Sequence, residues 1–204
     1  MKKPDSRSDS ISSDNSLALA DIKLTLDRLY HLKSVKRSGW LQVGIPSDQV
    51  ESVADHSLFV TLLALLLSDN EDHRINKFKV IRMALIHDLA ESVVGDITPE
   101  DGVTPDEKFR RESEALKSLL KPLPMAEELL ALWHEFENGD SVEAKFVRRL
   151  DKLEMVFQAA RYEASTGMDL SGFFTSVSAL FDEGELTPAL YQLLLESRNT
   201  AQDE

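Results

Sequence analysis

The chain contains no cysteine, and this absence excludes two kinds of architecture. Disulfide-rich scaffolds need paired cysteines, and thiolate metal sites need cysteine sulfur. Any metal ion must therefore be held by histidine, aspartate or glutamate. Such nitrogen and oxygen donors suit borderline and hard divalent ions, namely Mn, Co, Mg, Fe or Zn.

Long apolar runs are also missing. The best stretch, residues 58–67, is about ten residues long and contains Thr61, whereas a membrane-spanning helix needs about 20 apolar residues. The N-terminal segment carries two lysines with no apolar stretch behind them, unlike a secretory signal. We therefore expect a soluble protein of the cytoplasm or the nucleus, without a membrane partner.

Positive charge is scarce: 23 lysines and arginines face 36 aspartates and glutamates, a formal net charge of -13. A nucleic-acid groove needs lysine and arginine to neutralise phosphates, so no nucleic-acid polymer is expected as a partner. A small phosphorylated substrate stays open, because a bound metal ion and one or two arginines can reverse the local field.

No segment alternates convincingly between apolar and polar residues with period two, and no internal repeat is present, so the predicted fold class is all-α. Residues 1–16 are rich in serine and aspartate and are predicted to form a disordered tail, which leaves 17–204 as one domain. Glycine and proline predict a long loop over 33–50. The apolar periodicity predicts helices over 17–30, 52–67, 76–92, 105–120, 125–137, 141–165, 172–181 and 187–198.

Three ionisable residues, His87, Asp88 and Glu91, lie within five positions of an otherwise apolar predicted helix. Burying such groups costs several kcal/mol unless they are paired or ligated. Within one helix His87 and Glu91 would share a face at spacing i, i+4. The structural alternative is a helix end that turns to solvent, with both acids hydrated.

His56 follows the acidic residues Glu51 and Asp55 at the start of a predicted apolar helix. Acidic residues complement the dipole at a helix N-terminus, and Ser52 can cap it. This explanation accounts for the acids but not for His56, which leads directly into the apolar stripe. A histidine there is either a hydrogen-bonded core residue or a ligand.

Asp151 lies beside Val147 and Leu150, at the edge of the apolar stripe of the longest predicted helix. As an isolated residue it could simply pair with Arg148 or Lys152 on the surface. Taken with the two histidines and Asp88, however, it completes a set of two nitrogen and two oxygen donors. Such a site leaves open positions for water and substrate, lowers the pKa of bound water and polarises a phosphoryl oxygen, as phosphoester hydrolysis requires.

The order of these residues, H…HD…D, resembles the HD-domain superfamily of metal-dependent phosphohydrolases, which are helical bundles. The chain is most similar to the 5'-deoxynucleotidase branch, the HD domain-containing protein 2 family. The resemblance covers about residues 17–165, whereas the loop over 41–50 departs from it. The matching segments are RSGW at 37–40, ESVADH at 51–56, ALIHDLAE at 84–91, VGDITP at 94–99, EKFRRE at 107–112 and EAKFV at 143–147.

The resemblance implies a 5'-deoxynucleotidase that hydrolyses deoxyribonucleoside 5'-monophosphates, holds a divalent metal ion and forms a homodimer. Two other hypotheses stay open: an HD enzyme for another phosphoester, such as guanosine tetraphosphate or a cyclic nucleotide, and a non-catalytic scaffold on the same fold. The implied metal ligands are His56, His87, Asp88 and Asp151. The implied catalytic residues are Glu91 and Asp96, and the implied substrate-binding residues are Arg37 for the phosphate and Trp40 for the sugar or base.

The remaining conspicuous residues are assigned structural roles. Trp133 is expected in the core, and three histidines are expected at the surface: His31, His73 and His134. The basic cluster Lys108, Arg110 and Arg111 is interspersed with glutamates, which is typical of a solvated, ion-paired helix face. Of these three residues, Lys108 could also reach a phosphate.

Overall fold

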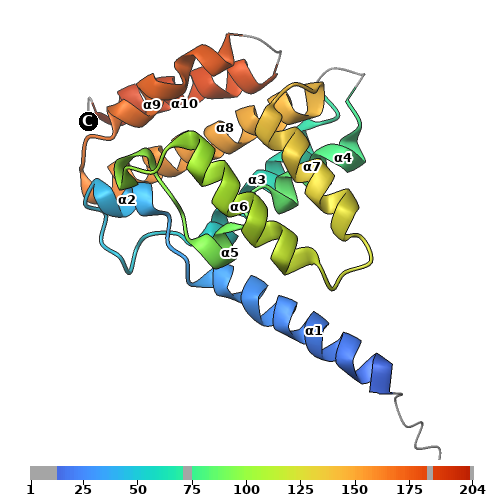
Figure 1. Cartoon of the computed structure of the whole chain (residues 1–204). Helices are drawn as coiled ribbons and strands as arrows, with labels where there is room; N and C mark the ends of the chain where they lie inside the picture. Colours follow the sequence, from blue (N-terminus) through green and yellow to red (C-terminus); the bar gives the residue numbers. More distant parts are fainter. Residues whose placement is uncertain (1–12, 71–74, 183–185, 203–204) are drawn as a thin grey trace, which may run out of the picture.

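The computed structural model describes residues 13–70, 75–182 and 186–202, and these fold into helices joined by loops (Figure 1). The all-α prediction is confirmed, since the β-pairing among the described residues is an isolated bridge between Lys36 and Ser52. In the same residues, no helix is both long and apolar enough to cross a membrane. The elements are α1 Ser13–Tyr30, η1 His31–Lys33, α2 Ser38–Gln42, α3 Val53–Leu67, α4 Lys77–Ile86, α5 Glu91–Val94, η2 Pro99–Asp101, α6 Pro105–Leu120, α7 Ala126–Asn138, α8 Val142–Thr166, α9 Ser171–Val177, η3 Ser178–Phe181 and α10 Leu186–Gln202.

Two buried clusters form the core, and α8 belongs to both. The first gathers apolar side chains of α3, α4, α6, α7 and the first half of α8, including Met83, Trp133 and Phe146. The second lies between the second half of α8, α9, α10 and the segment around Trp40. In Figure 1, α9 and α10 lie together at one end of the molecule, while α1 extends away from the bundle at the other end.

The start of α3 follows the sequence prediction. Ser52 caps the helix by accepting a hydrogen bond from the Asp55 backbone N–H at 3.2 Å, and the Asp55 carboxylate accepts one from the Ser52 N–H at 2.9 Å. This capping box fixes the first turn. His56, the next residue, consequently points into the protein with 0% of its surface exposed.

The predicted helix over 76–92 is wrong in being continuous, because α4 ends at Ile86 and residues 87–90 form a turn before α5 begins at Glu91. Side chains take the carbonyls that a continuing helix would use. His87 Nδ1 contacts the Ala84 carbonyl at 2.7 Å, and the Trp133 indole N–H donates to the His87 carbonyl at 3.0 Å. The Glu91 N–H accordingly donates to Asp88, not to His87. His87 and Glu91 therefore do not share one helix face.

The predicted loop over 33–50 contains the short helix α2, which buries Trp40. Backbone hydrogen bonds from Arg37 N–H to the Glu51 carbonyl and from Val53 N–H to the Val35 carbonyl hold this segment against the start of α3. Arg37 is thereby placed near His56. Of the tail expected over 1–16, residues 13–16 belong to α1, and 1–12 lie outside the described residues, as does His73.

Candidate metal and catalytic site

Four potential ligand side chains converge from α3, the turn after α4, and α8. His56 Nε2 lies 3.4 Å from His87 Nε2, 3.3 Å from Asp151 Oδ1 and 3.6 Å from Asp88 Oδ2. His87 Nε2 lies 3.3 Å from Asp88 Oδ2. The fold thus brings together the residues that the resemblance implies as metal ligands.

The separations among His56, His87 and Asp88, and the one between His56 and Asp151, are those expected of neighbouring ligands of a divalent ion. Metal–nitrogen and metal–oxygen bonds of about 2.0–2.2 Å place neighbouring ligand atoms of a tetrahedron about 3.3–3.6 Å apart. His56, His87 and Asp88 form a compact group with donor atoms within 4.8 Å of one another. Asp151 lies outside this group but contacts His56 Nε2 through its Oδ1 at 3.3 Å. A mixed imidazole and carboxylate set is compatible with Mn, Co, Mg, Fe or Zn.

Both aspartates carry their charge in this buried place. Burial raises the pKa of Asp151, but Lys152, His56 and His87 together bring it well below its ordinary value. The pKa of Asp88 is also lowered, because His87, Arg37 and His56 outweigh the effect of burial. Ionised carboxylates are the form that binds a metal cation.

Among the described acids beside the ligand cluster, Glu91 is the one with a buried oxygen that lacks a hydrogen-bond partner. Only 4% of the residue is exposed, and among the described residues its Oε2 has no hydrogen-bond partner. Burial, followed by the charges of Asp88 and Asp96, raises the pKa of this carboxyl group well above its ordinary value. A carboxyl group with a raised pKa beside the ligand cluster is suited to proton transfer.

Arg37 and Asp96 lie beside the ligand cluster, next to Asp88. Arg37 Nη1 lies 3.5 Å from Asp88 Oδ2 and 3.6 Å from Asp96 Oδ1. The Ser38 backbone N–H donates to Asp96 Oδ2 at 2.5 Å, and the Ser38 hydroxyl donates to the Asp96 carbonyl at 2.9 Å. Although burial alone would lower the pKa of Arg37, the surrounding carboxylates raise it, so the guanidinium stays charged.

A cavity of about 920 Å³ opens onto these residues. Its polar side carries His87, Asp88, Glu91 and Asp151, and its other wall includes Phe173 of α9. Trp40 also lines the cavity, but only 3% of its surface is exposed. The Trp40 ring packs on Phe173 with centroids 4.4 Å apart, and its indole N–H donates to Glu51 at 2.9 Å.

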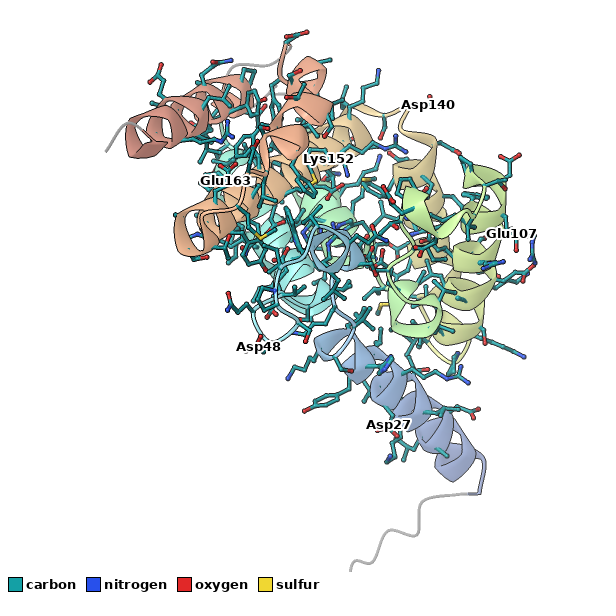
Figure 2. All side chains as sticks on the ribbon, turned by 90° about the vertical axis from the view of Figure 1, so that its left-hand side faces the viewer. Asp27, Asp48, Glu107, Asp140, Lys152 and Glu163 are labelled. Atoms are coloured by element: carbon teal, nitrogen blue, oxygen red, sulfur yellow. The ribbon has the colours of Figure 1, made fainter. Side chains whose placement is uncertain are left out.

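The basic cluster on α6 divides between two environments. Arg110 and Arg111 are exposed and pair with Glu107 at 2.8 Å and 2.6 Å, as expected from the sequence. Figure 2 shows Glu107 at the outer edge of the molecule, directed away from the bundle. Lys108 instead lines the cavity, where its ammonium donates to the Ile97 carbonyl at 3.0 Å. Although burial lowers its pKa, Glu112, Glu91 and Asp88 raise it, so Lys108 is a second cation beside the site.

One buried residue of the site was missed in the sequence. The Glu154 carboxylate lies 2.5 Å from His56 Nδ1, on the side of the ring opposite the ligand cluster, and only 3% of Glu154 is exposed. A signal for it existed, because Glu154 follows Leu150 by one helical turn and so falls on the apolar face of α8. An acid on such a face needs a partner.

The structural roles assigned to Trp133 and His31 are confirmed, whereas His134 lies less at the surface than expected. Trp133 is fully buried in the first core cluster. His31 is exposed, with its Nδ1 3.1 Å from the Ser92 carbonyl. His134 is half-buried and meets the Ser113 hydroxyl at 3.0 Å.

Comparison with known proteins places these features in a family. The sequence model of the HD domain matches residues 29–187. The chain is 39% identical over 169 residues to human 5'-deoxynucleotidase HDDC2, with 81% of this chain and 80% of that protein covered. It is 44% identical over 156 residues to 5'-deoxynucleotidase hdd1 of Schizosaccharomyces pombe, with 72% of this chain and 76% of that protein covered.

Solved structures agree. The PH0347 protein from Pyrococcus horikoshii OT3 superposes with a TM-score of 0.69 at 31% identity, over 87% of this chain and 98% of that one. A protein from Magnetospirillum magnetotacticum described as a predicted metal-dependent phosphohydrolase gives 0.72 at 25% identity, over 95% of this chain and 98% of that one. The chain therefore belongs to the HD domain family, in the branch whose curated relatives are named 5'-deoxynucleotidases.

Proposed function

We propose that the protein is a metal-dependent phosphohydrolase that converts deoxyribonucleoside 5'-monophosphates into deoxynucleosides and phosphate. The observation that carries the proposal is the convergence of two imidazoles and two carboxylates at the wall of one cavity, beside Glu91, whose buried Oε2 has no hydrogen-bond partner among the described residues. The names of the related proteins support the reaction and the substrate class.

The metal ligands in this proposal are His56, His87, Asp88 and Asp151. A divalent ion bound there supplies a Lewis acid for the phosphoryl group and lowers the pKa of bound water. The identity of the ion is left among Mn, Co, Mg, Fe and Zn, because the donor set suits each of them.

The chain's own side chains bind the phosphate and move the protons. Among the cations that line the cavity, Arg37 and Lys108 are close enough to Glu91 to act on its pKa, so they neutralise the phosphate oxygens. Glu91 accepts the proton of the attacking water as the new oxygen–phosphorus bond forms and the bond between phosphorus and the 5'-oxygen breaks. Asp96, fixed by Ser38, positions a second water that gives a proton to the leaving 5'-oxygen, and the proton taken up by Glu91 restores this water.

A different wall of the cavity is available for the sugar and base of the substrate. Trp40 and Phe173 lie in ring contact along the cavity. Since little of Trp40 is exposed, we propose that it contacts substrate through one edge and otherwise supports Phe173. The wall is apolar here, which suits the faces of a nucleobase.

The test is phosphate release from a panel of deoxy- and ribonucleoside 5'-monophosphates with added Mn, Co or Mg. Wild type is compared with Asp88→Ala and Glu91→Ala, and with Glu114→Ala as a control at the surface of α6. Metal-dependent release from deoxynucleotides, lost in the first two variants alone, is the expected result. No release from any monophosphate by a metal-bound protein would contradict the substrate class and point to guanosine tetraphosphate or a cyclic nucleotide. A protein that binds no metal would be a scaffold.

We also propose that the protein is a homodimer, through an apolar face of α3. The face consists of Leu58, Phe59, Leu62, Leu65 and Leu66, which are between 41% and 66% exposed. Their spacing of one, four, seven and eight residues from Leu58 places them on one side of the helix. Exposed apolar area of this kind in a soluble protein marks an interaction surface.

Sedimentation or light scattering tests the dimer. The variants Leu62→Glu and Leu65→Glu should shift the mass from dimer to monomer, whereas Leu180→Glu, at an exposed leucine of η3, should leave it unchanged. A wild type that is already monomeric at micromolar concentration would contradict the proposal. The domain limits 17–204 and the compartment stay predictions.

A further inference from the structure

We propose that Glu154 is a positioning residue that fixes the ring of His56, so that His56 Nε2 faces the other ligands. The proposal rests on the metal centre assigned under the proposed function. The H…HD…D pattern does not include Glu154. Its role follows from one contact, in which Glu154 Oε2 lies 2.5 Å from His56 Nδ1.

The contact is built on rigid elements. His56 belongs to the capped first turn of α3, and Glu154 follows Asp151 by three residues in the 25-residue helix α8. Residues at this spacing lie on one side of a helix. One helix therefore presents a direct ligand, Asp151, to His56 Nε2 and an orienting carboxylate, Glu154, to His56 Nδ1. The imidazole is held from both ends.

The burial of the pair argues for a specific role. His56 is 0% and Glu154 3% exposed, and a carboxylate with so little water needs a strong hydrogen-bond donor. His56 Nδ1–H is that donor. Its bond to Glu154 selects the tautomer with a free lone pair on Nε2, the form that binds a metal, and makes that nitrogen a better donor.

Glu51, His56 and Glu154 also have donor atoms within 4.8 Å of one another. They could in principle hold an ion on the Nδ1 side. The 2.5 Å contact argues against this, since two ligand atoms bound to one ion at about 2.0 Å lie about 2.8 Å or more apart. Glu51 has another donor, the indole N–H of Trp40 at 2.9 Å.

The experiment measures Co²⁺ binding to the metal-free full-length protein by its visible absorption, without reference to activity. Wild type is compared with Glu154→Ala and Glu154→Gln. Loss of an orienting carboxylate weakens metal binding by about 10–100-fold, and we expect Glu154→Ala near the upper end of that range. Glu154→Gln should lie near the lower end, because its amide oxygen can still accept the Nδ1–H bond. The number of bound ions should equal that of wild type.

Glu143→Gln is the matched control. Glu143 is a buried glutamate of the same helix, 7% exposed, but it binds the Asn76 N–H at 3.0 Å, far from the ligands along α8. It should keep wild-type Co²⁺ affinity even if its unfolding midpoint falls. Helical circular dichroism of each metal-free variant checks the fold, and ¹⁵N chemical shifts of His56 in Glu154→Gln report the tautomer directly.

Three results would overturn the inference. Wild-type Co²⁺ affinity in folded Glu154→Ala would show that the contact does not position His56. Loss of a whole bound ion in Glu154→Gln would make Glu154 a ligand and not a positioning residue. An equal loss of affinity in Glu143→Gln would reduce the effect to general stability of α8. Absence of Co²⁺ binding in wild type would instead remove the metal centre itself, and the proposed function with it.

Discussion

Replacing Glu91 by glutamine should raise the stability of the metal-free protein and lower its catalytic rate. Glu91 is 4% exposed, its Oε2 lacks a partner among the described residues, and Asp88 and Asp96 are close enough to raise its pKa. A buried polar atom without a hydrogen bond costs about 1–3 kcal/mol. The glutamine amide is neutral and can donate to a neighbouring aspartate, so the free energy of unfolding should rise by about this amount.

The rate should move in the opposite direction. An amide cannot accept a proton from water at neutral pH, and loss of a general base typically lowers a rate by about 10²–10⁴-fold. Urea unfolding in EDTA gives the stability, and phosphate release from a deoxynucleotide with added metal gives the rate. Glu143→Gln serves as the control, because Glu143 is fully paired with Asn76 and Lys79. This control should lose stability and keep its rate.

Each half of this prediction can fail separately. A Glu91→Gln protein less stable than wild type would mean that the carboxyl group is well satisfied in its buried place, contrary to the geometry. A retained rate would mean that another group accepts the proton of the attacking water. A variant that gains stability and loses activity indicates that the original residue serves function and lowers the stability of the fold.

Three more substitutions test other parts of the structure. Trp133→Phe removes the donor to the buried His87 carbonyl, so urea unfolding should show that the free energy of unfolding falls by about 1–3 kcal/mol. An unchanged unfolding midpoint would contradict the role of Trp133 in ending α4. Lys108→Met should weaken inhibition by inorganic phosphate by about 10-fold or more, because a charged hydrogen bond contributes about 1.5–3 kcal/mol. Arg110→Met, the control, should leave the inhibition constant unchanged. Equal inhibition constants in wild type and both variants would show that Lys108 does not bind the phosphate. Burial raises the pKa of Glu112 to about 7 in the folded protein, above the ordinary value of 4.5, so its contribution to stability is full below pH 4.5 and lost as the pH rises through 7. Glu112→Gln lacks this loss, and its stability relative to wild type should grow between pH 4.5 and 7 by up to roughly 3 kcal/mol; a difference independent of pH would be the contrary result.

Local signals in the sequence were sufficient for most helices. The prediction over 105–120 coincides with α6, because Thr104 caps this helix and Pro105 suits its first turn. Likewise Ser141 caps α8, and Gly167 ends it with a left-handed residue. These features involve neighbours in the chain, so the amino-acid pattern contains them.

Contacts between segments that are distant in the chain could not be predicted from the amino-acid pattern. The break after Ile86 depends on Trp133, 46 residues beyond the carbonyl that it binds. The Glu154–His56 contact spans 98 residues. For the same reason, the pattern on α6 could not show that Lys108 turns inward while Arg110 stays in solvent. The ligand set was implied by family resemblance, and the fold brings its members together.

The division of the core between two clusters has an evolutionary consequence. His87 contacts side chains of the first cluster, whereas Phe173 belongs to the wall formed by the second. Mutations in α9, which lines the cavity, can therefore reshape the space proposed for a sugar or base while His87 keeps its contacts in the first cluster. A lineage could in this way acquire a new nucleotide preference through α9 and retain the hydrolytic chemistry of its ancestor.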